Sequence, residues 1–166
     1  MLTQTFNRTN RCIITVFILL FTLTGCASFK AKPTDLILRI KAAADLNPDI
    51  DNRPSPVVLK LLVLKEATIF ENARFFELWE NAQDTLGEQL VFSQELELFP
   101  NSTHTTGTIE LPMDAEYIGV IAGYRFLDKS KWRAMYKLNE DKKLYLNVYL
   151  NSLAIELQKG KKKDNF

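Results

Sequence analysis

The segment VVLKLLVL, Val57–Leu64, predicts the central strand of a β-sheet. It begins with β-branched residues, and its apolar side chains fall on both faces of an extended chain. Lys60 is its single polar residue. Because strands that are apolar on both faces are covered on both faces, we expect this segment in the middle of a sheet.

The sequence that follows changes its apolar period and predicts helix. Apolar side chains recur there at three-residue steps, at Phe70, Ala73, Phe76 and Trp79. Residues 67–86 therefore predict one or two helices that Gly87 ends, with Asn72 as the N-cap of a helix that begins at Ala73. We interpret the aromatic stripe as core and not as a ligand pocket.

Seven further segments have strand patterns. They are residues 34–44, 90–99, 108–111, 117–124, 132–138, 144–150 and 153–157. Residues 101–107 predict a polar turn between two of them. Because the connections are mostly too short for repeated β-α-β crossovers, we predict a mainly β domain over residues 34–158. Its expected architecture is an antiparallel β-sandwich of seven to eight strands with a small helical insertion after the second strand.

The first predicted strand has one apolar face, formed by Leu36, Leu38, Ile40 and Ala42. Asp35, Arg39 and Lys41 fall on its other face. Ile37 interrupts this polar face, so we expect the outer side of the strand to be partly covered.

The connection between the first two strands, residues 45–56, reads DLNPDIDNRPSP and fits no regular element. Its three prolines restrict the unbound conformations, which lowers the entropic cost of presenting the loop to a partner. Leu46 and Ile50 are apolar residues in an otherwise polar segment. Two interpretations stay open: a binding loop, or a plain surface connection in which Leu46 packs inward.

Residues 1–25 are typical of a lipoprotein signal peptide. Arg8 and Arg11 lie in a polar start, and residues 13–23 are nearly all apolar but shorter than the ~20 residues needed to cross a bilayer. Leu23-Thr24-Gly25-Cys26 has the spacing of a lipobox, in which cleavage before Cys26 leaves a thiol for diacylglycerol and an amine for a third acyl chain. The alternative is an uncleaved signal anchor with an ordinary cysteine.

The expected anchor also predicts where the domain lies. Residues 26–33, the lipidated cysteine and its tether, reach about 20–25 Å, so the domain would stay near the membrane. Ala27 and Ser28 replace the Asp that typically retains bacterial lipoproteins in the inner membrane. We therefore expect the inner leaflet of the outer membrane, with the domain facing the periplasm. Cleavage would also remove Cys12, so no disulfide is expected.

Composition argues against a nucleic-acid partner. The chain has 21 basic and 20 acidic residues, and cleavage would remove two basic ones, which leaves a net charge of about −1. Residues 159–166 predict a disordered basic tail.

No motif in the sequence indicates catalysis. The chain lacks G-x-S-x-G, H-E-x-x-H, P-loop and G-x-G-x-x-G patterns, and His104 is its only histidine. The carboxylate pairs Glu95/Glu97 and Asp114/Glu116 fit a solvated face better than acid–base work. We expect no enzyme, no metal and no cofactor apart from the covalent lipid on Cys26.

Several stretches together resemble the TssJ family, the outer-membrane lipoproteins of type VI secretion systems. Besides the lipobox, they are ADLNPD (44–49) with RPSPV (53–57), FFEL (75–78), YIGVIA (117–122) with Tyr124-Arg125, and Trp132-Arg133. The resemblance covers most of the mature chain in the expected order, and LNPD…RPSPV is its most specific part.

This resemblance implies a transthyretin-like sandwich that docks the periplasmic domain of an inner-membrane protein, TssM, and so ties a membrane complex to the outer membrane. The implied contact is the loop between the first two strands. Its candidate partner-binding residues are Leu46, Asn47, Pro48, Asp49, Ile50, Asp51, Asn52, Arg53 and Pro54.

Two other classes of function remain open. One is a periplasmic lipoprotein that carries a small hydrophobic ligand between its sheets, for which an enclosed apolar cavity is required. The other is a hydrolase, for which a pocket with convergent polar groups is required.

Overall fold

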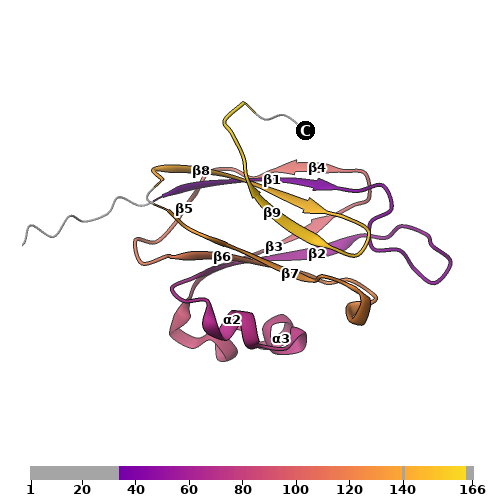
Figure 1. Cartoon of the computed structure of the whole chain (residues 1–166), viewed down its shortest axis with the longest axis horizontal. Helices are drawn as coiled ribbons and strands as arrows, with labels where there is room; N and C mark the ends of the chain where they lie inside the picture. The colour runs from indigo at the N-terminus through magenta and orange to yellow at the C-terminus, as the bar shows by residue number, and fades with distance from the viewer. Residues whose placement is uncertain (1–33, 140, 164–166) are drawn as a thin grey trace, which may run out of the picture. The chain divides into compact units, whose positions relative to one another are not determined.

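The computed structural model describes residues 34–139 and 141–163. The predicted signal peptide, Cys26 and the tether lie outside these residues, as does the end of the predicted tail. The part of the chain that is described contains two β-sheets and a helical layer (Figure 1).

The two sheets face each other and form a β-sandwich, which confirms the predicted fold class. The first sheet has the order β4 (Thr103–Thr105), β1 (Asp35–Ala42), β8 (Lys143–Leu150) and β9 (Ile155–Lys159), and β5 (Ile109–Glu110) also pairs with β1. The second sheet has the order β3 (Leu90–Leu98), β2 (Val57–Leu64), β6 (Tyr117–Ala122) and β7 (Arg133–Lys137). The predicted central strand, β2, lies between β3 and β6.

Two local features differ from the expectation. The pair of β1 and β8 is parallel, from Asp35 opposite Lys143 to Ala42 opposite Leu150, whereas the other strand pairs of both sheets are antiparallel. These strands are far apart in sequence, so no tight turn fixes their relative direction. In addition, residues 103–105 were expected in a turn but form β4, which pairs with β1 through its backbone although its side chains are polar and exposed.

The space between the sheets is occupied by one cluster of buried apolar side chains from both sheets. β2 contributes Leu59, Leu61 and Val63 to this cluster. Leu62 and Leu64 face the other way, into a second cluster under the helices. This division explains why the strand is apolar on both faces.

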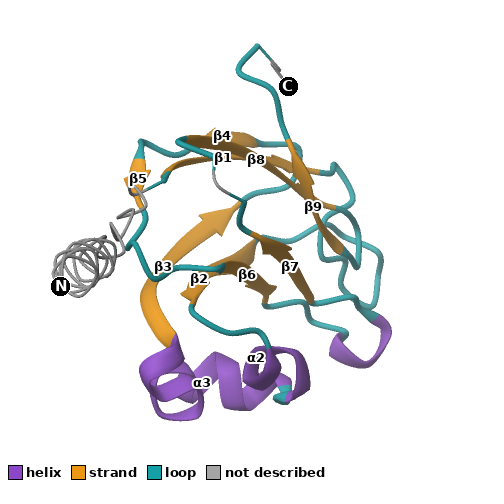
Figure 2. Ribbon diagram, turned by 60° about the vertical axis from the view of Figure 1, so that its left-hand side comes forward, coloured by secondary structure: helices purple, strands orange, loops and turns teal. Residues whose placement is uncertain are grey.

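The helical layer covers the outer face of the second sheet (Figure 2). It consists of α2 (Thr68–Asn72), α3 (Phe75–Leu86) and the short 3₁₀ helix η1 (Gly87–Gln89). The ring of Phe70 lies on Gly119, and that of Trp79 lies on Gly123, where glycine leaves room for close approach. Arg133 donates through Nη1 to the carbonyl oxygens of Phe70 and Ala73, both at 2.9 Å, and so ties the end of α2 to the sheet.

Two details of the helical prediction are wrong. Phe76 belongs to the predicted core stripe but is 59% exposed. The stripe is divided between two helices with a break at Ala73 and Arg74, so a constant three-residue step does not follow one buried face. The break also places the N-cap of α3 at Arg74, whereas the Asn72 side chain donates to the carbonyl of Thr68.

The C-terminal end of the domain also differs from the prediction. Lys159 was assigned to the tail but is the last residue of β9. Arg39 reaches beyond it and donates to the carbonyl oxygens of Lys161 and Lys162, at 2.6 and 2.9 Å. These residues therefore lie on the outer face of the first sheet.

Candidate functional site

The connection between β1 and β2 projects from one end of the sandwich, at the right of Figure 1. Residues 46–56 of this connection, which we call the β1–β2 loop, include all the predicted partner-binding residues. The loop contains no helix or strand, so side-chain contacts must define its shape.

The base of the loop is part of the folded core. Leu46 is fully buried among side chains of both sheets. Asn47 is also buried, and its backbone N–H donates to the carbonyl of Ser152 in the β8–β9 turn at 2.9 Å. The side chains of Leu46 and Asn47 thus support the loop from beneath and do not present a surface to a partner.

The Asn47 amide joins both ends of the loop to the neighbouring connection. Its Oδ1 accepts from the backbone N–H of Arg125 at 2.8 Å, and its Nδ2 donates to the carbonyl of Pro56 at 2.8 Å. Asn47 has φ +48°, a left-handed conformation that asparagine tolerates better than most residues. Its side chain and its backbone conformation therefore both select asparagine.

Ser55 and Arg125 complete this base, and sequence reasoning did not identify their roles. Ser55 Oγ donates to the carbonyl of Asn47 at 2.6 Å and accepts from Arg125 Nε at 3.0 Å. Arg125 is close to the loop only in the fold, since 70 residues separate it from Ser55. The Tyr124-Arg125 pair that contributes to the family resemblance was the only sequence indication.

The tip of the loop closes around the carboxylate of Asp49. Its Oδ1 accepts from the backbone N–H groups of Asp51 and Arg53, and its Oδ2 accepts from Arg53 Nε, each at 2.9 Å. The backbone N–H of Arg53 contributes most to a lowered pKa of Asp49, and the Arg53 side chain and the Asp51 N–H lower it further. Asp49 is therefore ionised at neutral pH and holds the tip in a closed turn.

The closed tip presents an apolar side chain. Ile50 is 86% exposed, and Asp51, Asn52, Arg53 and Pro54 are also exposed. Arg53 Nη2 lies 3.0 Å from Asp51 Oδ2, so the charges beside Ile50 are paired with each other. Pro48 and Asp49 are half-buried and form the stem of the tip.

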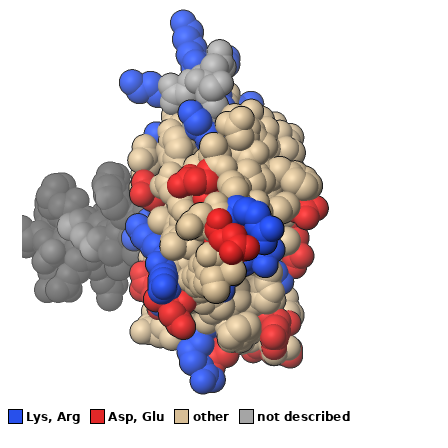
Figure 3. Space-filling view, turned by 90° about the vertical axis from the view of Figure 1, so that its right-hand side faces the viewer, with Lys and Arg blue, Asp and Glu red and all other residues tan. Residues whose placement is uncertain are grey.

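The surface at this end has charges of both signs. In Figure 3, which faces the loop end, Lys and Arg side chains are interspersed with Asp and Glu, and much of the surface between them is uncharged. Phe99, between β3 and β4, is exposed there, and the neighbouring Asn101 N–H donates to the carbonyl of Ala43 at 3.0 Å. Ile50 and Phe99 are thus exposed apolar side chains at one end of the sandwich.

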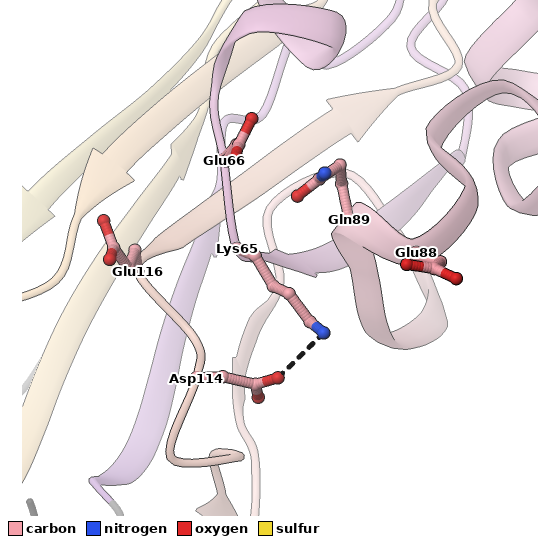
Figure 4. A pocket seen from close by; sticks show the side chains of 6 residues that line it. All are labelled: Lys65, Glu66, Glu88, Gln89, Asp114 and Glu116. Atoms are coloured by element: carbon pink, nitrogen blue, oxygen red, sulfur yellow. Dashed lines mark ion pairs between the residues drawn. The ribbon is translucent and has the colours of Figure 1, made fainter.

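A pocket of about 480 Å³ lies at the opposite end of β2 (Figure 4). Its lining residues are polar: Lys65, Glu66, Glu88, Gln89, Asp114 and Glu116. Lys65 Nζ lies 2.9 Å from Asp114 Oδ2, and this hydrogen bond raises the pKa of Lys65 and lowers that of Asp114. Asp114 is thus held in an ion pair with Lys65, whereas Glu116 lines the same pocket without taking part in that pair.

Neither a membrane-spanning helix nor a metal-binding cluster is found in the described ranges, 34–139 and 141–163. No helix there has the length and apolar character needed to span a bilayer. No group of three or more His, Cys, Asp and Glu side chains in the same ranges is placed to hold a metal ion.

Comparison with protein families identifies one match. Residues 34–159 match the family described as type VI secretion lipoprotein, VasD, EvfM, TssJ. A search of curated proteins returned no match.

Solved structures of similar proteins have the same fold. The lipoprotein TssJ1 of Pseudomonas aeruginosa is 32% identical with a TM-score of 0.74, over 78% of this chain and 98% of that one. Serratia marcescens Lip, described as a membrane-bound component of the type VI secretion system, is 27% identical with a TM-score of 0.70, over 77% and 98%. A chain from a structure described as the T6SS protein TssM C-terminal domain from EAEC shares the fold at 20% identity and a TM-score of 0.60, over 75% and 97%.

Proposed function

We propose that this chain, which belongs to the TssJ family of type VI secretion lipoproteins, is a docking protein. The family match over residues 34–159 establishes the membership. The β-sandwich of this chain binds the periplasmic domain of a TssM-like inner-membrane protein through the β1–β2 loop. The observation that carries this proposal is the loop itself, an exposed tip on a base that is hydrogen-bonded into the core.

The structure of the loop supports binding because little conformational freedom remains to be lost. The Asp49 carboxylate closes the tip, and Asn47 and Ser55 fix the base. A loop that already has its bound shape avoids much of the ordering cost of association. Ile50 supplies an apolar side chain that a partner can bury, and its charged neighbours form a polar rim.

The choice of a TssM-like partner rests on the family. The description of one structural relative names the TssM C-terminal domain, although at 20% identity that likeness itself concerns the fold alone. Among the predicted partner-binding residues, Asp49, Ile50, Asp51, Asn52, Arg53 and Pro54 form the tip of the loop that a partner can reach.

The docking function requires attachment to a membrane. Cleavage before Cys26 and acylation of that residue would hold the domain at the inner leaflet of the outer membrane, facing the periplasm. Anchoring raises the local concentration of the domain, so modest affinity for the partner suffices when several copies assemble.

The interior of the domain favours docking over the other two classes. A carrier of hydrophobic ligands needs an enclosed apolar cavity, whereas apolar side chains of both sheets occupy the space between them as one buried cluster. A hydrolase commonly needs a nucleophile that an acid and a base orient in a pocket. The lining of the pocket in Figure 4 includes no Ser, Thr, Cys or His, and its Lys65 is paired with Asp114. We propose no catalytic activity.

Calorimetric titration of the unlipidated mature chain, residues 27–166, with the periplasmic domain of the cognate TssM tests the proposal. We expect binding by the native chain and its loss when residues 49–53 are replaced by Gly and Ser with the fold intact by circular dichroism. Ile50→Ser alone is expected to weaken binding at least about tenfold, because truncation of a buried apolar anchor typically costs more than 1 kcal/mol.

Met113→Ser is the matched control, since Met113 is 62% exposed but lies at the opposite end of β6 from the loop. Its affinity is expected to remain within about twofold of the native value. Equal losses from Ile50→Ser and Met113→Ser would remove the loop from the interface, and absence of binding by the native chain would overturn the docking function.

A further inference from the structure

The helical layer and the outer side of the first sheet differ in their balance of charge. The helical layer, residues 66–89, carries six acidic side chains and one basic, Arg74, which is paired with Glu77. Among the described residues, the first sheet and its flanking segments carry eight basic side chains and four acidic. The basic ones are Arg39, Lys41, Lys142, Lys143, Lys159, Lys161, Lys162 and Lys163, and the acidic ones are Asp35, Glu110, Asp141 and Glu156. Lys159 lies opposite the core residue Leu146 and pairs with Asp141, so the other seven basic side chains form the basic outer face.

The C-terminal part of this basic face is held in place by the fold. We call residues 160–163 the C-terminal strap. Arg39 is only 9% exposed, and its guanidinium binds the carbonyls of Lys161 and Lys162 while lying 4.7 Å from the centre of the Tyr145 ring. The Gly160 N–H donates to the carbonyl of Tyr145 at 2.8 Å. The strap therefore continues from β9 onto the outer face of the sheet.

The strap approaches the sheet closely at Gly160. A Cβ on Gly160 would lie 2.6 Å from Oδ1 of Asn147, a buried residue of β8. Lys161, Lys162 and Lys163 follow this contact and are exposed. In Figure 3, Lys and Arg side chains project at the top, where Figure 1 places the C-terminal segment.

The chain reaches the described domain through this same sheet. Thr34 Oγ1 donates to the carbonyl of Asp141, and the Asp35 N–H donates to the carbonyl of Lys142. Asp141 also pairs with Lys159 at 2.6 Å, which joins the start of the domain to the end of β9. Because Cys26 is only eight residues before Thr34, the point where the chain enters this sheet can lie no farther than roughly 25–30 Å from the proposed lipid anchor.

We propose that this basic face lies against an anionic phospholipid surface, the leaflet into which the lipid on Cys26 is inserted. The inference rests on the proposed anchor, which determines the membrane surface that the face meets. The electrostatic attraction to that surface comes from residues of the domain. Clustered lysines bind phosphate headgroups electrostatically, and the acidic helical layer on the other side is repelled by the same surface. The domain is thereby oriented with its first sheet toward the membrane and its helices away from it.

Vesicle binding by the unlipidated mature chain, residues 27–166, tests the proposal without the anchor. The TssJ1 and Lip chains are aligned over 98% of their own length with 77–78% of this chain, so the fold needs no more of the chain than this domain. We expect co-sedimentation with mixed phosphatidylcholine and phosphatidylglycerol vesicles, little with phosphatidylcholine alone, and a loss of binding at high salt.

Two double variants with the same change in net charge distinguish membrane binding through the strap from binding that depends on net charge alone. Lys162→Glu/Lys163→Glu changes the strap, and Lys129→Glu/Lys131→Glu changes two exposed lysines between β6 and β7. We expect the strap variant to bind anionic vesicles at least about tenfold more weakly and the control to stay within about threefold of the native chain. Equal losses in the two variants would mean that net charge alone acts, which overturns the proposed face.

Fluorescent labels test the orientation, since residues 27–166 contain no cysteine and accept a single introduced one. Thr105→Cys places a label on the first sheet, and Glu80→Cys places one on α3. Lipid quenchers should reduce emission from the first label and not from the second. Stronger quenching on α3, or binding to peptidoglycan sacculi without binding to anionic vesicles, would overturn the inference.

The two proposals fail independently in these experiments. The strap variant is expected to keep its affinity for the TssM-like partner, because the strap is on the outer face of the first sheet and the loop tip is at the end of the sandwich. Loss of vesicle binding with partner binding retained therefore concerns the strap alone. Absence of partner binding by the native chain concerns the docking function alone.

Discussion

At the scale of single residues, Asn47 connects the loop to the fold through three hydrogen bonds. Its amide binds Arg125 and Pro56, and its backbone N–H binds Ser152. The residue thus joins two ends of one loop to two other connections that are distant in sequence. A buried amide that loses such partners leaves donors and acceptors unsatisfied.

We predict that Asn47→Ala lowers the free energy of unfolding by about 2 kcal/mol or more, because the Arg125 N–H and the Pro56 carbonyl lose their partner and alanine fits φ +48° poorly. Urea denaturation measures this change. Asn52→Ala is the control, since Asn52 also has a positive φ, +59°, but is exposed. A cost of Asn47→Ala no larger than that of Asn52→Ala would contradict the role of the amide.

At the scale of elements, the helical layer depends on two glycines of the β6 region. Phe70 of α2 lies against Gly119, and Trp79 of α3 lies against Gly123. Lys60, on the outer face of β2, also reaches this layer and donates to the carbonyl of Trp79 at 2.7 Å. The pairing of small residues on the sheet with rings on the helices sets how closely the two layers pack.

We predict that Gly119→Ala lowers the free energy of unfolding by about 1–3 kcal/mol, because the new Cβ would lie 2.8 Å from the Phe70 ring in a filled cluster. Thermal or urea denaturation measures the effect. Gly107→Ala is the matched control, because a Cβ there meets no atom within 4 Å, and its stability should be close to native or higher. If both variants were equally stable, the contact of Phe70 with Gly119 would not limit the packing.

At the scale of the whole molecule, the two proposals divide the surface of the domain by task. The β1–β2 loop at one end of the sandwich is available to a partner, and the first sheet with its strap is available to the membrane. The polar pocket at the other end of β2 has no role in either. This arrangement allows an anchored domain to bind a partner without leaving the membrane.

We predict that Cys26→Ser releases the chain from the outer-membrane fraction and abolishes type VI secretion, because two or three acyl chains supply most of the membrane affinity. The isolated domain should still bind its partner with native affinity, since Cys26 lies before the first strand. Fractionation and a secretion assay measure the two effects. Cys12→Ser, in the predicted signal peptide, is the control and should behave as the native chain does. Normal secretion by Cys26→Ser would contradict the requirement for an anchor.

The parts of the fold that the sequence predicted are those with a local pattern. Alternation located β1, β3 and β8, the run at Val57–Leu64 located the central strand, and a change of period located the helices. β4 was missed because its three polar residues form a strand only through pairing with β1. The exposure of Phe76 was missed because two helices, and not one, carry the stripe.

The candidate site was likewise predicted only where a local pattern marked it. Prolines and a family resemblance located the β1–β2 loop, but they did not distinguish the residues that support it from those that it exposes. Leu46 and Asn47 proved to be buried, whereas Ile50 is at the tip. Ser55 and Arg125 gained their roles only because the β6–β7 connection packs beside the loop.

The β-sandwich, its helical insertion and the membership of a lipoprotein family could be read from the amino-acid sequence, because periodicity and motifs are properties of neighbouring residues. The tertiary structure alone decided the parallel pair of β1 and β8, the closure of the loop and the position of the strap under Arg39. Each of these depends on contacts between segments that are distant along the chain. Such contacts form only when burial of the common core brings the segments together, and no local pattern encodes them.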